Sequence, residues 1–172
     1  MIQIDLQIDD EFIEQVKGAA LSAAVEETLR QQGIARANVT IVITDDKTVH
    51  ELNRTFRDVD SPTDILSFPN HEAIGLTDNS DSDQIAAPRL VVPPQLIEEQ
   101  NSYLGDLIIG FPYTRRQAVA QNRAVDAELL LLVIHGTLHL LGHDHADAQD
   151  EAAMWALQNR VLIALCQEPV MP

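Results

Sequence analysis

Residues 127–141 are almost all apolar, and this stretch constrains the fold more than any other part of the chain. A helix that is apolar around its whole circumference has to be buried, so we expect it to lie at the centre of the fold. Its longest unbroken apolar run, residues 129–134, is far shorter than the roughly 20 residues that cross a membrane. Gly142 follows the stretch and is predicted to end the helix.

The remaining pattern predicts strands and helices around this central helix. Ile2, Ile4, Leu6 and Ile8 alternate with polar residues, which indicates a strand with one buried face. Further strands are predicted over 39–44, 63–69 and 104–111, and further helices over about 10–32, 46–57, 113–122 and 146–166. We therefore expect one α+β domain over residues 1–172, with helices packed on a small sheet.

Residues 70–102 interrupt this pattern. They contain Pro88, Pro93, Pro94 and the polar run TDNSDSD at 77–83, and they show no periodicity. A structureless loop of this length is uncommon inside a compact domain, so we interpret the segment as a flexible insertion. A surface loop without a function of its own is the simplest role for it.

The charge balance limits the partners of the chain. It has 27 acidic and 11 basic residues and a formal net charge of −16, which argues against non-specific binding of nucleic acid or anionic membranes. A local basic site would need the few clustered cations, which are Arg54, Arg57, Arg115, Arg116 and Arg123. The single cysteine excludes an intrachain disulfide, and no basic segment precedes an apolar run at the N-terminus. We expect a soluble cytoplasmic protein.

Four of the six histidines fall within HGTLHLLGHDH at 135–145. His135 and His139 are four residues apart, so on a helix they share a face about 6 Å apart along the axis, a spacing that suits two ligands of one metal ion. His143 would lie about 12 Å from His135 along a straight helix. A turn at Gly142 would instead let His145 fold back onto the pair. Three such ligands leave a fourth position open for water, which is typical of catalytic zinc.

The other histidines and Asp144 are interpreted separately. Asp144 either orients an imidazole or caps the following helix. His50 and His71 lie outside the cluster, and we expect them on the surface. The spacing is close to that of the metzincin metalloproteases, in which a glutamate directly follows the first histidine and acts as the general base. Here that position is Gly136, which cannot take a proton, so ordinary zinc proteolysis is poorly supported.

Three segments together give a more specific match. The chain resembles the YbeY-type bacterial endoribonucleases, which are ribosomal RNA maturation factors. The segments that carry the resemblance are NRTFRDVDSPTDILSFP at 53–69, LGDLIIG at 104–110 and HGTLHLLGHDH at 135–145. The resemblance implies a four-stranded mixed sheet with about five helices, and a central helix that carries the metal. It further implies one zinc ion per chain, held by His135, His139 and His145, and Arg57 as a catalytic and substrate-binding residue. Residues 70–102 depart from the family pattern.

The same resemblance implies an activity and partners. The implied activity is cleavage of single-stranded RNA, in the maturation of the 3′ end of 16S ribosomal RNA and in ribosome quality control. The implied partners are the small ribosomal subunit or its assembly factors. Neither membrane nor DNA is expected as a partner. The chemistry of Arg57 is consistent with RNA cleavage, because its guanidinium can bind a phosphodiester bidentately and offset charge in the transition state. A salt bridge at a helix end is the alternative role for Arg57.

Some alternatives stay open at the level of the sequence. Thr63, Asp64 and Ser67 either lie near the site or serve only as turn residues. Two functions are alternatives to RNA cleavage. The chain could be a metal-dependent hydrolase of a peptide or a small phosphoester, or a non-enzymatic ribosome-assembly factor whose zinc stabilises the fold. The fourth zinc ligand would distinguish catalytic from structural metal, because water supports catalysis and a protein ligand does not.

Overall fold

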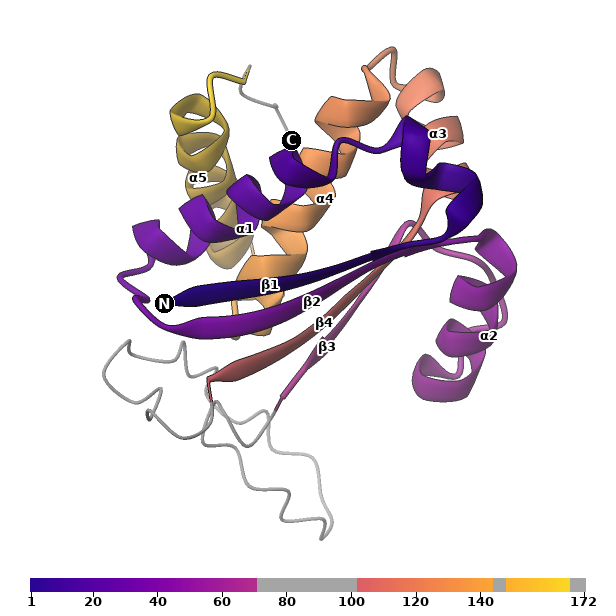
Figure 1. Ribbon diagram of the computed structural model, residues 1–172, viewed down its shortest axis with the longest axis horizontal. Coiled ribbons are helices and arrows are strands. Elements are labelled where there is room, and N and C mark those ends of the chain that lie inside the picture. The colour runs from indigo at the N-terminus through magenta and orange to yellow at the C-terminus, as the bar shows by residue number, and fades with distance from the viewer. Residues whose placement is uncertain (71–101, 144–147, 168–172) are drawn as a thin grey trace, which may run out of the picture.

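The alternating N-terminal residues form strand β1, whose apolar side chains face the core while the polar ones face solvent. The structure, a computed structural model, describes residues 1–70, 102–143 and 148–167 (Figure 1). Its elements in chain order are β1 (Ile2–Ile8), the 3-10 helix η1 (Asp10–Gln15), α1 (Gly18–Gln31), β2 (Ala37–Thr44), α2 (Asp46–Arg57), β3 (Ile65–Pro69), β4 (Tyr103–Gly110), α3 (Phe111–Ala120), α4 (Val125–Leu140) and α5 (Ala148–Ala164).

The four strands form one mixed sheet in the order β1-β2-β4-β3. β1 and β4 both run parallel to β2, whereas β3 runs antiparallel to β4. In Figure 1, α1, α4 and α5 gather on one face of the sheet, while α2 stands apart from them. This arrangement confirms the predicted α+β class and the four-stranded mixed sheet.

Helix α4 occupies the centre, as its composition predicts. Each residue from Glu128 to Leu140 is buried except His135 and His139, which are half-buried. The helix packs against α1, α3 and α5 on its sides and against β3 and β4 beneath it. The two histidines therefore lie where an otherwise buried helix meets a cavity. Among the described residues, no helix is both long enough and apolar enough to cross a bilayer.

The predicted single helix over about 10–32 is wrong. Residues 10–15 form the short helix η1, Val16 is extended with φ −115° and ψ 124°, and α1 begins only at Gly18. The break allows Phe12 and Val16 to be buried in the core while α1 packs closely on β1. A Cβ atom at position 18 would lie 2.6 Å from Cδ2 of Leu6, so any larger residue there would force the Leu6 side chain to shift.

The predicted insertion joins two neighbouring strands. β3 and β4 pair with each other, and both ends of the connection are hydrogen-bonded to the sheet. The amide of Asn70 donates to the carbonyl of Leu104, and the amide of Asn38 donates to the carbonyl of Ser102. Residues 71–101 lie outside the described residues, so the flexibility of the insertion stays a prediction.

Candidate active site

Helix α4 brings two imidazole rings into contact, as the spacing predicts. The Nε2 atoms of His135 and His139 are 2.9 Å apart, and the ring centroids are 4.5 Å apart at an interplanar angle of 81°. The other ring nitrogen of His135, Nδ1, lies 2.7 Å from Oε1 of Gln158. A carboxamide oxygen only accepts hydrogen bonds, so Nδ1 carries the proton. Nε2 of His135 therefore keeps its lone pair facing His139, which is the arrangement that a metal ligand needs.

Gly142 turns the chain directly after this pair. It has φ +87°, its amide donates to the carbonyl of His139, and the amide of His143 donates to the carbonyl of Leu138. These two bonds form the Schellman motif, in which glycine is favoured because of its positive φ. The predicted end of the helix is confirmed.

The remaining histidines are placed differently. Nε2 of His143 lies 3.2 Å from Oε1 of Gln32, the residue that follows α1, and burial lowers the pKa of His143. His50 is paired with Asp60 on the surface, as expected, with 2.7 Å between Nε2 and Oδ1. The predicted third ligand, His145, lies outside the described residues, as do Asp144 and His71.

Gly136 has a packing role that the sequence does not reveal. A Cβ atom there would lie 2.8 Å from both Cδ1 of Ile65 and Cδ2 of Leu107, and 3.1 Å from Oγ of Ser67. Because position 136 has no side chain, α4 lies against β3 and β4 here without displacing these side-chain atoms. A glutamate at this position, as in the metzincins, would be aimed into the sheet.

A cavity of about 620 Å³ opens beside the two histidines. Its lining includes Arg57 from the end of α2 and three residues proposed to lie near the site, Thr63, Asp64 and Ser67. Nη2 of Arg57 donates to the carbonyl oxygen of Ser67 at 2.8 Å. Among the described residues this main-chain oxygen, rather than a carboxylate, is the hydrogen-bond partner of Arg57. No carboxylate among the described residues is therefore paired with this guanidinium.

A chain of hydrogen bonds holds Asp64, one of the residues that line the cavity. Oδ1 of Asp64 accepts from the amide of Ile65, and Oδ2 accepts from Nε2 of Gln117 at 3.1 Å. Gln117 also donates to the buried carboxylate of Glu128 at 2.9 Å, and Arg123 donates to the other oxygen of that carboxylate at 3.0 Å. This chain ties the segment before β3 to α3 and α4, so Asp64 is held in place by three elements.

The sequence did not lead us to predict roles for Glu128, Gln158 and Asn53 at the site, although each is a polar residue in an apolar pattern. Glu128 is an acid within the apolar helix, and it is only 2 % exposed. Gln158 interrupts the apolar stripe of α5, and Asn53 interrupts that of α2. Asn53 is buried and donates from Nδ2 to the carbonyl of Ser61 at 2.8 Å, which orders the connection to β3. A buried polar residue on an apolar helix face requires a hydrogen-bond partner, and for Gln158 that partner is His135 of the site.

Fewer of the clustered arginines are available to bind RNA phosphates than their number implies. Arg116 is paired with Asp46 at 2.6 Å, and Arg123 is paired with Glu128. Two of the five clustered arginines are thus neutralised by carboxylates. Arg57 lines the cavity shared by both histidines, whereas Arg123 lines a separate hollow of about 440 Å³ next to His135.

Comparison with known proteins agrees with this architecture. The family model described as Endoribonuclease YbeY matches residues 2–165. Among curated proteins, the Endoribonuclease YbeY of Shouchella clausii is 33% identical over 167 residues, covering 94% of each chain. That of Roseiflexus castenholzii is 37% identical over 166 residues, covering 95% of this chain and 93% of the relative.

A solved structure shows the same fold. A solution structure of a Thermotoga maritima protein superposes with a TM-score of 0.57 at 24% identity, covering 96% of this chain and 89% of that one. The family match spans every described strand and includes both contacting histidines, Arg57 and the residues before β3. The chain therefore belongs to the YbeY family of endoribonucleases.

Proposed function

We propose that this chain is a zinc-dependent endoribonuclease that cleaves single-stranded RNA at the cavity between α2, β3 and α4. One observation carries the proposal: two imidazole nitrogens converge to 2.9 Å in a cavity that Arg57 also lines. Metal-ligating nitrogens and a guanidinium facing one cavity are the groups that phosphodiester chemistry uses.

The histidine pair fits one zinc ion with little adjustment. Two nitrogens about 2.1 Å from a tetrahedral zinc are about 3.4 Å apart, so the observed pair needs to open by only a few tenths of an ångström. His135, His139 and His145 would hold the ion, with His145 approaching after the turn at Gly142. Bound there, zinc would supply Lewis-acid activation of a phosphate oxygen or of an attacking water.

The residues of the chain have distinct roles in this proposal. Arg57 binds the phosphodiester and offsets the negative charge that develops during cleavage. Its bond to the Ser67 carbonyl keeps the guanidinium oriented before the substrate arrives. Gln158 fixes the proton of His135 on Nδ1. Asp64 orders the wall of the cavity, because both of its oxygens are already hydrogen-bonded.

The family resemblance supports a proposal for the natural substrate and partner. We propose that the chain acts in the cytoplasm on ribosomal RNA, in the maturation of the 3′ end of 16S ribosomal RNA and in ribosome quality control. The small ribosomal subunit or one of its assembly factors would supply the docking that a chain with a net charge of −16 needs on RNA.

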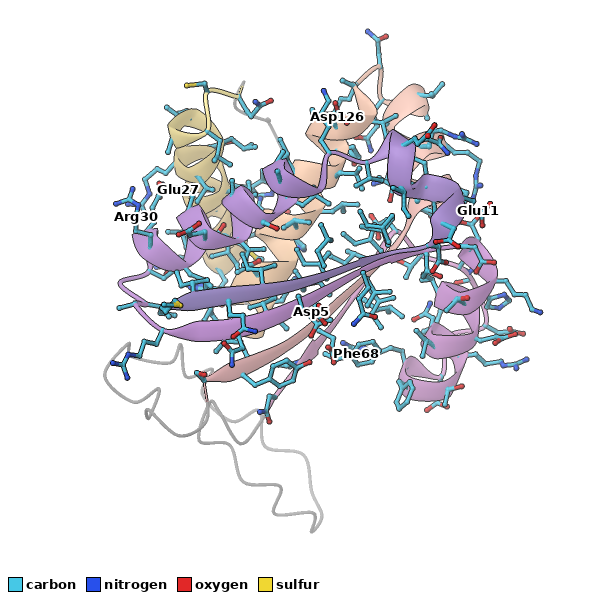
Figure 2. All side chains as sticks on the ribbon, viewed as in Figure 1. Asp5, Glu11, Glu27, Arg30, Phe68 and Asp126 are labelled. Atoms are coloured by element: carbon cyan, nitrogen blue, oxygen red, sulfur yellow. The ribbon has the colours of Figure 1, made fainter. Side chains whose placement is uncertain are left out.

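The decisive experiment compares three substrates. The zinc-loaded protein is incubated with single-stranded RNA, with the same sequence as a duplex, and with casein. We expect cleavage of the single strand alone, and an Arg57→Ala variant that folds and keeps its zinc but loses the cleavage. Arg30→Ala is the matched control, because Arg30 lies on α1 and is paired with Glu27 (Figure 2).

Each other outcome points to a different function. Cleavage of casein but not of RNA would identify a peptidase. An intact RNA in the presence of fully bound zinc would favour the assembly factor with a structural metal. Unchanged cleavage by Arg57→Ala would remove Arg57 from the mechanism.

A further inference from the structure

An exposed aromatic side chain stands beside the proposed cleavage site. Phe56, the residue before Arg57 on α2, is 64% exposed. Its ring meets that of Phe68 on β3 edge to face, with centroids 5.5 Å apart at 75°. In Figure 2, Phe68 extends from the sheet toward α2. Burial of a phenylalanine side chain favours folding, and Phe56 forgoes much of this gain.

The aromatic pair is physically continuous with the cavity. Phe56, Arg57, Phe68 and Pro69 line a hollow of about 300 Å³, and Arg57 and Pro69 also line the larger cavity of the histidines. The guanidinium carbon of Arg57 lies 5.9 Å from the centroid of the Phe68 ring, within cation–π range. A polymer whose phosphate contacts Arg57 would therefore have its neighbouring unit at the aromatic pair.

The chemistry of this hollow fits one class of ligand. Unpaired bases of RNA stack on aromatic side chains, whereas bases within a duplex are already stacked on each other. Stacking is also independent of net charge, so it gives affinity for RNA that a chain of net charge −16 cannot gain from long-range attraction.

We propose that Phe56 and Phe68 form an aromatic platform that stacks one unpaired base of the RNA, next to the phosphate bound by Arg57. The inference rests on the proposed function, and it names a subsite by which single strands are selected over duplexes.

The test asks whether the contribution of Phe56 to binding depends on one particular base of the RNA. Short single-stranded RNAs, each with an abasic nucleotide at a different position, are titrated into the zinc-loaded protein, and binding is followed by fluorescence anisotropy. Cleavage of the same RNAs is measured separately. We expect one abasic position to weaken binding to the wild type about tenfold or more, and to cause no further loss in Phe56→Ala.

Matched variants separate stacking from general apolar contact. Phe56→Trp should retain the affinity, while Phe56→Leu should lose it, because leucine keeps apolar bulk but has no ring. Val119→Ala is the control, since Val119 is a 73% exposed apolar residue on α3. Circular dichroism and zinc content should be those of the wild type in all of these variants, because Phe56 is largely outside the core.

The outcomes distinguish the platform from the cleavage activity. Wild-type affinity of Phe56→Ala, or losses that simply add at every abasic position, would overturn the platform and leave the nuclease proposal intact. Binding that depends on Phe56 without any cleavage would support the platform and overturn the nuclease proposal. RNA that the wild type neither binds nor cleaves would overturn both.

Discussion

Replacing Gly136 by alanine tests how tightly α4 is seated on the sheet. The new Cβ atom would lie 2.8 Å from Cδ1 of Ile65 and from Cδ2 of Leu107, where ordinary contacts are 3.4–4 Å. Leu107 is fully buried, so its side chain can shift only against close-packed neighbours of the core. Overpacking of this kind costs about 1–3 kcal/mol, whereas glycine to alanine within a helix gains about 1 kcal/mol. We expect a net loss of about 1 kcal/mol in the free energy of unfolding.

Urea denaturation of the two proteins measures this difference. A loss of about 1 kcal/mol would lower the melting temperature by about 2–4 °C for a chain of this size. Ile65→Val deletes the clashing Cδ1 atom, so alanine at 136 should cost at least about 0.5 kcal/mol less in that background than in the wild type. If Gly136→Ala instead stabilised the protein by about 1 kcal/mol, helix propensity alone would govern the position and the close contact would be refuted.

Three further substitutions probe the metal ligands and the start of α2. His139→Ala should lose its stoichiometric zinc in metal analysis, and an intact zinc content would refute the three-histidine site. Gln158→Leu should weaken zinc binding about 10–100-fold in chelator competition, whereas Gln158→Glu, which still accepts from His135, should not. Asp45→Ala should lower the free energy of unfolding by about 1 kcal/mol at pH 7, because Asp45 caps α2 through the amide of Thr48 at 2.8 Å. That hydrogen bond lowers the pKa of Asp45, so the stabilisation is lost as the pH falls below about 4, and an unchanged difference at pH 3 would contradict it.

Features that depend on short-range spacing could be predicted from the sequence. The period-two pattern of β1, the burial of α4, the turn at Gly142 and the contact of His135 with His139 all follow from residues within a few positions of one another. The geometry of a helix or strand fixes such relations whatever the rest of the chain does. The same local reasoning predicted an unbroken helix over 10–32, because apolar spacing alone does not reveal the extended Val16.

The tertiary structure decided which distant residues meet the histidine pair. Arg57 reaches the cavity because α2 contacts β3, and β3 in turn packs against α4. Gln158 reaches His135 because α5 packs along α4. The chain from Asp64 through Gln117 to Glu128 joins three elements that no local pattern connects. The same is true of Gly136, where the atoms that a side chain would meet belong to Ile65 and Leu107 on two neighbouring strands. Contacts of this kind depend on strand order and on the packing of helices against the sheet, and those are properties of the whole chain rather than of any segment.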